Sequence, residues 1–236
     1  MLSNITINGT VSKILEQSNT PEGKLTGTLV MNISKIINKQ TGETGTFPIL
    51  VNLYGENLVI KASEAQLDSP IIIAGTLMQK EYENADGSKF KSIVIDASHV
   101  LPNMPMDTEI NTLAVVGRLG QEPELKYFES GSSVASTTLA FNHAKNQTSW
   151  FGLKAWGKCG EILAQYAKKG SQIGAQGNLD FEQWINKETG ALNQKASINM
   201  SRLELLGEKS GGSSESAQMG VPNSDSKPVE SGNTLF

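Results

Sequence analysis

The sequence has few of the residues on which several common sites and architectures depend. Its 236 residues include one cysteine, Cys159, which excludes an intramolecular disulfide framework. Two histidines, His99 and His143, add too few soft ligands for a zinc cluster. The 20 Lys and Arg are outnumbered by 24 Asp and Glu. The net charge of -4 therefore argues against a simple basic coat for nucleic acid, since such domains usually have a pI above ~9.

Long apolar runs and catalytic motifs are also missing. No apolar run approaches the ~20 residues of a membrane-spanning helix, and residues 1–4 lack the basic and apolar segments of a signal peptide. We therefore expect a cytoplasmic protein with no membrane association. No glycine-rich phosphate loop, paired carboxylate motif or nucleophile elbow is evident. We predict no catalytic residue, no metal, no cofactor and no enzymatic activity, and interpret His99, His143 and Cys159 as structural or solvated groups.

What the sequence does contain is an internal repeat. Similar segments recur at a displacement of 102 residues, and small insertions increase this displacement slightly further along the chain. A nearly constant offset is typical of two copies of one domain. The best-matched pairs are Val51–Gly55 with Leu153–Gly157, Ile73–Leu77 with Ala175–Leu179, and Tyr82 with Trp184.

Composition divides the chain into four parts. The first copy spans residues 1–101, and residues 102–106 form a linker because Pro102 and Pro105 interrupt regular structure. The second copy spans residues 107–206. From 207 to 236 the chain is rich in Gly, Ser, Pro, Asn, Glu and Lys, a composition too poor in apolar groups to fold. We predict a disordered C-terminal tail there.

Each copy has the pattern of an all-β domain. The second copy has five strand-like runs separated by Gly, Ser and Asn turns, with a helical pattern over 160–170 between the third and fourth runs. The first copy places its helix over 55–69. Five strands with one such helix predict two tandem OB-folds, each a five-stranded Greek-key barrel. The expected strands of the second copy are Leu113–Leu119, Val134–Phe141, Trp150–Trp156, Gln172–Trp184 and Ala196–Leu206, which leaves Asn142–Ser149 as a loop.

The third strand of the second copy carries aromatic residues on a face that we expect to be exposed. Successive side chains of a strand point to opposite sides, so Trp150, Lys154 and Trp156 share one face. A lysine is almost never fully buried without a partner, so this face is predicted to lie in solvent. The opposite face is apolar and is predicted to form the core: Phe151, Leu153 and Ala155.

Other aromatic residues follow the same pattern. Trp184 has the parity of Asp180 and Glu182 and should project from a polar face. In the first copy, Tyr54 corresponds to Trp156, and Tyr82 beside Lys80 corresponds to Trp184.

Two interpretations of these aromatics remain open from the residues alone. Exposed rings can stack on the bases of a single strand, which contributes about 1–3 kcal/mol per base, while nearby lysines neutralise phosphates. Alternatively, the rings fill the barrels or a dimer interface.

Five stretches of the second copy resemble the OB domain of bacterial single-stranded DNA-binding proteins, the SSB family. They are Gly117–Leu125, Ser149–Phe151, Ala155–Lys158, Tyr166–Ser171 and Gly177–Leu179 followed by Trp184. The resemblance covers nearly all of residues 110–206, in family order and spacing. It implies sequence-independent binding of single-stranded DNA in replication, recombination and repair. The resemblance, together with the repeat, predicts a DNA-binding site made of ten residues. They are Trp150, Lys154, Trp156, Lys158, Trp184, Arg118 and Lys126 of the second copy and Tyr54, Tyr82 and Lys80 of the first.

The resemblance also implies binding partners, and the sequence departs from the family pattern at several positions. Two copies in one chain suggest a homodimer with four OB domains, located at the nucleoid. The family's tail recruits replication and repair enzymes through an acidic, apolar tip; here Leu235 and Phe236 keep the apolar end but lack adjacent acids. Asp180 and Glu182 replace the family's basic residues, and the first copy has no tryptophan or arginine. An alternative function is therefore an SSB-derived assembly or adaptor protein that binds a protein partner with little DNA affinity.

Overall fold

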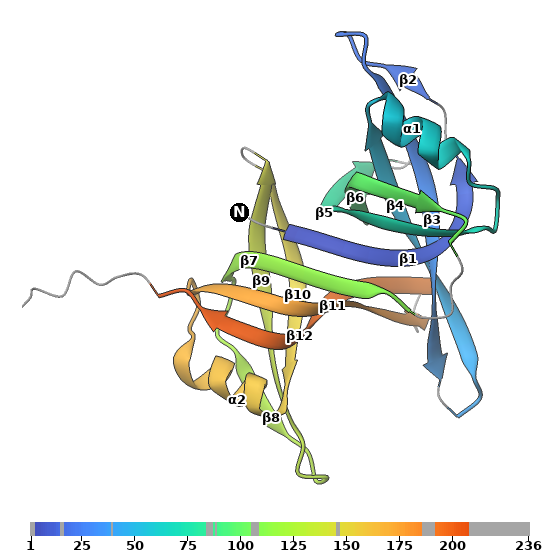
Figure 1. Cartoon of the computed structure of the whole chain (residues 1–236). Helices are drawn as coiled ribbons and strands as arrows, with labels where there is room; N and C mark the ends of the chain where they lie inside the picture. Colours follow the sequence, from blue (N-terminus) through green and yellow to red (C-terminus); the bar gives the residue numbers. More distant parts are fainter. Residues whose placement is uncertain are drawn as a thin grey trace, which may run out of the picture.

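A computed structural model describes most of the chain up to Gly207 (Figure 1). The predicted tail beyond this residue, with Leu235 and Phe236, lies outside the described residues, as do the last two positions of the expected linker. None of the described helices is long and apolar enough to span a membrane. The described ranges are 3–14, 17–38, 40–83, 87, 89–104, 109–144, 147–185 and 192–207.

The chain folds into two similar groups of strands, each with one short helix (Figure 1). The first group comprises β1 (Ser3–Ile14), β2 (Ser18–Asn19), β3 (Leu25–Asn38), β4 (Glu43–Tyr54), α1 (Glu56–Ser63), β5 (Pro70–Glu83) and β6 (Lys89–Pro102). The second group comprises β7 (Asn111–Leu119), β8 (Glu124–Tyr127), β9 (Ser133–Ala144), β10 (Gln147–Trp156), α2 (Gly157–Tyr166), β11 (Gln172–Ile185) and β12 (Leu192–Leu205).

Each group closes into a five-stranded barrel. In the first barrel the strands pair in the order β1-β3-β4-β6-β5, and β5 pairs again with β1. The second barrel repeats this order with β7, β9, β10, β12 and β11. In both, the third and fifth long strands are parallel and the helix joins the third to the fourth. This is the OB-fold, so the predicted fold class is confirmed.

Several predicted boundaries are wrong in detail. Helix α2 begins at Gly157 and ends at Tyr166, because Ala167 turns to an extended conformation and buries its side chain. Lys168 and Lys169 therefore follow the helix and do not lie in its last turn. Helix α1 stops at Ser63, where the chain turns to bury Ala65.

The strands are longer than predicted, and two short strands were missed. β9 and β10 extend to Ala144 and from Gln147, so most of the expected loop over 142–149 is strand, including His143. β6 continues through Pro102, which lies opposite Ile71 of β5 at the end of the strand. The short strand β8 follows Pro123 and continues along β9 where β7 leaves it.

The two barrels join edge to edge into one sheet of 12 strands. β1 and β7 run antiparallel at the centre, with Ser3 opposite Val115 and Ile7 opposite Asn111 (Figure 1). This pairing was not predicted, because nothing in a strand's own pattern identifies its neighbour. It holds the two barrels in one continuous hydrogen-bonded framework.

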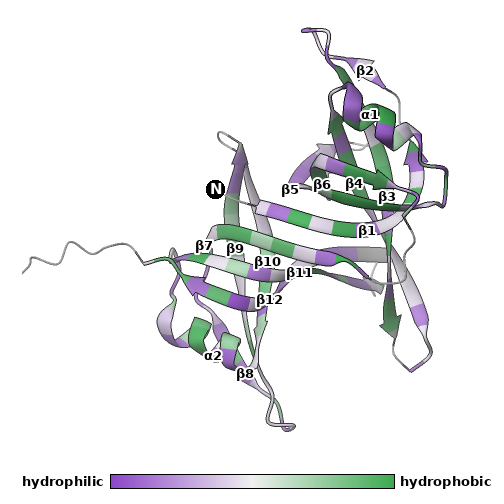
Figure 2. Ribbon diagram, in the orientation of Figure 1, coloured by the Kyte–Doolittle hydropathy of each residue, from purple (hydrophilic) through white to green (hydrophobic). Residues whose placement is uncertain are grey.

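The cores follow the alternation of each strand. Figure 2 shows apolar and polar residues alternating along β1, which is typical of a strand with one face buried. In β7 the residues 113–116 are all apolar, but burial still alternates, with Leu113, Val115 and Leu119 in the core. A bulge in the fifth long strand lies at the same repeat position in both barrels, where Ser98 and Ser201 are the extra residues beside Gly75 and Gly177 of the fourth strand. A Cβ on Gly177 would lie 2.0 Å from the Asn199 carbonyl oxygen, so this close crossing requires glycine.

Candidate nucleic-acid interface

The outer face of the second barrel carries three exposed tryptophans. Trp150 and Trp156 project from β10, and Trp184 projects from β11; their side chains are 50%, 50% and 47% exposed. The alternate residues of β10, Phe151 and Leu153, are each 1% exposed because they face the core. The strand geometry thus places large flat rings in solvent on a rigid sheet, where a flat ligand can stack on them.

The ring of Trp150 lies across a glycine. A Cβ on Gly120 would lie 2.6 Å from Cζ3 of Trp150, so a larger residue there would displace the ring. Ala140 pairs with Trp150 on one side and with Arg118 on the other, which places all three on the same face. The Arg118 guanidinium donates a 3.0 Å hydrogen bond to the Gly170 carbonyl, so it is anchored beside this face.

Trp156 has an aromatic neighbour that the sequence interpretation missed. Phe128 stacks on it with ring centroids 5.9 Å apart, and the Lys126 ammonium lies 5.6 Å from the Phe128 ring centroid. Phe128 follows β8, and the adjacent Tyr127 is 65% exposed. Consecutive aromatics beside a lysine on a polar stretch were the signal available in the sequence. The structure adds Phe128 to Trp156 and Lys126 as one cluster.

Lys154 is ion-paired across the face. Its ammonium binds the Glu182 carboxylate, which reaches over from β11. Asp180 on the same strand binds Lys35, which belongs to β3 of the first barrel and also donates to the Phe181 carbonyl at 2.9 Å. Asp180 and Glu182 are therefore both neutralised by lysines, and the charge of Lys154 is only partly available to a phosphate.

Replacing Glu182 with Gln removes the carboxylate that competes with a DNA phosphate for the Lys154 ammonium. We expect Glu182→Gln to increase affinity for oligo(dT) about twofold to fivefold at low salt and to steepen the salt dependence by up to ~0.7, the slope for one phosphate on a single strand. Fluorescence titration over a range of salt concentrations measures both. The matched control is Glu204→Gln, which removes the same charge from an exposed pair with Arg202, a residue outside the predicted site. An equal effect of the two variants would contradict this role of Glu182.

Lys195 is a second cation that sequence reasoning missed. It lies opposite Glu182 on β12, and its Nζ passes about 3.7 Å from the position that a Cβ on Gly152 would occupy. Because Gly152 has no side chain, there is room for Lys195 to lie between Trp150 and Lys154. Lys158 lies nearby on α2, where its side chain is 81% exposed and 3.6 Å from Glu161.

The first barrel presents a different face at the corresponding positions. Tyr54 is 54% exposed, but Asp96, which accepts a 2.7 Å hydrogen bond from Asn52, places a negative charge near both Tyr54 and Tyr82. Partial burial and the charge of Asp96 raise the pKa of both tyrosines, so both rings stay uncharged at neutral pH. The position of Lys154 in β10 is thus taken in β4 by Asn52, which is bonded to the Asp96 carboxylate. Lys80 lies on β5 near Tyr82, and both line a hollow that Trp150 of the second barrel also lines.

The predicted residues therefore fall into two groups. The structure brings Trp150, Lys154, Trp156 and Trp184 together on one sheet face, with Arg118, Lys126 and Lys158 at its margins. Tyr54, Tyr82 and Lys80 lie on the other barrel. In the described part of the chain, no three His, Cys, Asp or Glu side chains are grouped as metal ligands.

Comparison with known proteins places this geometry in a family. The model of the single-strand binding protein family matches residues 110–206, almost the whole second barrel. Single-stranded DNA-binding protein 1 of Synechocystis sp. is 44% identical over 104 residues, covering 42% of this chain and 86% of the relative. Single-stranded DNA-binding protein 1 of Nostoc sp. is 44% identical over 113 residues, covering 46% of this chain and 95% of the relative.

Solved structures match both barrels at once. The wild-type single-stranded DNA binding protein from Thermus aquaticus superposes with a TM-score of 0.60 at 17% identity, covering 98% of this chain and 97% of that one. A deletion mutant of that protein gives 0.61 at 19% identity. At such identities the likeness shows the shared two-barrel fold. Since this chain covers most of each curated relative at 44% identity and the family model matches the tryptophan-bearing barrel, the chain belongs to the single-strand binding protein family.

Proposed function

We propose that this protein binds single-stranded DNA without sequence specificity, as a non-enzymatic coat that protects the strand. The observation that carries the proposal is the set of three half-exposed tryptophans on one rigid face of the second barrel. Every base offers a flat π-face, so stacking on Trp150, Trp156 and Trp184 tolerates any sequence. Lysines beside the rings, Lys154 and Lys195 among them, contact the phosphates between stacked bases.

Tryptophan fluorescence tests this function directly. All three tryptophans lie on the proposed face. We expect oligo(dT) to quench their emission strongly at low salt, with an affinity that falls as salt rises because bound phosphates release counterions. The same sequence as a duplex should quench much less, since its bases are already stacked. No quenching by oligo(dT) at low salt would reject this function and favour the alternative, an adaptor protein with little DNA affinity.

We infer that residues 1–101 and 107–206 act as two domains with unequal roles, joined by residues 102–106. The first barrel has Tyr54 and Tyr82 where the second has tryptophans, and the negative charge of Asp96 near both tyrosines opposes a phosphate. This supports a weaker contribution of the first domain to DNA affinity. The second domain supplies most of the stacking.

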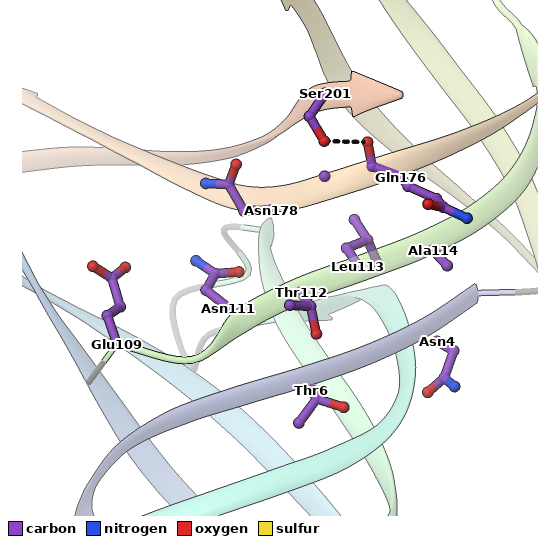
Figure 3. A pocket seen from close by; sticks show the side chains of 11 residues that line it. Asn4, Thr6, Glu109, Asn111, Thr112, Leu113, Ala114, Gln176, Asn178 and Ser201 are labelled. Atoms are coloured by element: carbon purple, nitrogen blue, oxygen red, sulfur yellow. Dashed lines mark hydrogen bonds between the residues drawn. The ribbon is translucent and has the colours of Figure 1, made fainter. Parts of the chain in front are cut away.

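A homodimer with four OB domains is the assembly we propose. Across β1, β7 and β11 lies a hollow of about 660 Å³ that is lined by short uncharged side chains, among them Asn4, Thr6, Thr112 and Gln176 (Figure 3). Glu109 is the one charged group among its described lining residues. A lysine-free surface of this kind suits protein contact better than phosphate contact. Sedimentation should give twice the chain mass of 25.3 kDa, and a monomer mass would reject the dimer.

A strand-coating function places the protein in replication, recombination and repair. We propose that it acts in the cytoplasm at the nucleoid, where single strands are exposed, and that replication and repair enzymes dock on its C-terminal tip, Leu235 and Phe236. The apolar end of the tail supports this docking. Pull-down of such enzymes by the full chain, compared with a chain lacking residues 235–236, tests it.

A further inference from the structure

A groove lies between the two barrels, beside the tryptophan face. It encloses about 500 Å³, which is within the range of small-molecule sites. The first barrel contributes Pro48, Lys91 and Ile93 to its lining, and the second contributes Trp150 and Lys195. One exposed tryptophan of the candidate interface is therefore also a wall of an inter-barrel groove.

Two hairpins hold the walls of this groove in place. In Figure 1 the β3–β4 hairpin extends from the first barrel beside the ends of β11 and β12. There Phe47 stacks on Phe181 with centroids 5.1 Å apart, and the Gln194 amide donates to the Thr46 carbonyl at 2.9 Å. The ion pair of Lys35 with Asp180 joins the same elements.

The second hairpin, β9–β10, extends from the second barrel to β5. The buried hydroxyl of Ser149 accepts a 2.9 Å hydrogen bond from the Gln79 backbone N–H. His143 is 3.0 Å from the same hydroxyl. Contacts on both sides therefore fix the groove, and a ligand that enters it pays little cost for ordering the protein.

The groove continues onto the first barrel. A second hollow of about 600 Å³ shares Gln79, Lys91 and Trp150 with it and extends along β5 to Lys80 and Tyr82. Glu81 is the one carboxylate among the described residues that line the two hollows. In the described part of the chain, neither Lys91 nor Lys195 forms an ion pair with a carboxylate.

We propose that the inter-barrel groove is a nucleotide subsite built from both barrels, in which a base stacks on Trp150 while Lys91 and Lys195 bind the flanking phosphates. This inference rests on the proposed function and extends it. The single strand leaves the tryptophan face at Trp150, crosses the barrel junction past Lys91 and continues along β5 toward Lys80. The first barrel thus joins DNA binding where β5 and β6 carry Lys80 and Lys91.

Lysine substitutions in the full-length protein test the subsite. We expect Lys91→Ala and Lys195→Ala each to weaken oligo(dT) binding about threefold to tenfold at low salt and to reduce the salt slope by about 0.7. The matched control is Lys61→Ala on α1, which removes the same charge from an exposed helix that lines neither hollow. It should leave affinity and slope nearly unchanged. Thermal midpoints confirm that each variant is folded.

A double substitution distinguishes the binding of one nucleotide by both Lys91 and Trp150 from a general effect of lost positive charge. If Lys91 and Trp150 hold the same nucleotide, the loss in Lys91→Ala/Trp150→Ala should be clearly smaller than the product of the two single losses. Strictly multiplicative losses, or a Lys91→Ala variant that binds like Lys61→Ala, would overturn the subsite while leaving the proposed function intact. Failure of the unsubstituted protein to bind oligo(dT) would instead reject the proposed function itself.

Discussion

Substitution of Trp150 by alanine should reduce the affinity for oligo(dT) by about 10-fold to 100-fold. Stacking contributes about 1–3 kcal/mol per base, and each 1.4 kcal/mol is a factor of ten. Trp150 is half exposed on the sheet face and also lines the inter-barrel groove, so its loss removes a ring at the point where the two barrels meet. Fluorescence anisotropy of labelled oligo(dT) measures the change without relying on the missing indole.

The matched control for this prediction keeps a ring at position 150. Trp150→Phe retains an aromatic face and should lose less than a third of the free energy lost in the alanine variant. Neither change should alter the free energy of unfolding much, because exposed side chains contribute little to stability. An alanine variant that binds within twofold of the original protein would contradict a stacking role for Trp150.

Substitution of the next residue, Phe151, should have the opposite effect, because it should chiefly lower the free energy of unfolding. Phe151 is 1% exposed and packs on Phe141 with ring centroids 5.6 Å apart, both inside the second barrel. Phe151→Ala removes the buried ring and leaves a cavity, so we expect the free energy of unfolding to fall by about 3–5 kcal/mol. Urea denaturation followed by circular dichroism measures the loss.

Two controls test whether the loss of stability comes from the buried volume of the Phe151 ring. Phe151→Leu keeps most of the buried volume and should lose less than half as much stability. Phe128→Ala removes a ring of the same size from the surface cluster with Trp156 and should change stability by less than about 1 kcal/mol. A loss below 1 kcal/mol in Phe151→Ala would show that the barrel core does not depend on this ring.

These two neighbours show why much of the fold could be predicted. Trp150 and Phe151 differ in exposure only because successive residues of a strand face opposite sides, and that alternation is visible in the sequence. The repeat offset predicted two barrels of one plan, and the structure repeats even the bulge opposite Gly75 and Gly177. Local periodicity and repetition were therefore sufficient for the fold class and the tryptophan face.

Element ends and pairing partners could not be predicted in the same way. α2 stops three residues before Lys169 because Ala167 turns into the core, a tertiary contact that its helical spacing does not reveal. The ion pairs of Lys154 with Glu182 and of Lys35 with Asp180 join residues 28 and 145 positions apart. Periodicity within one strand carries no information about such partners.

The sequence by itself determined that this chain has two OB barrels and that one of them exposes three tryptophans, because alternation and repetition are properties of the covalent order. Only the tertiary structure decided how the barrels meet. The pairing of β1 with β7 and the contacts of the β3–β4 and β9–β10 hairpins with the opposite barrel bring Lys91 of one barrel to Trp150 of the other. That juxtaposition depends on contacts between residues far apart in the chain, which become neighbours only when both barrels have closed.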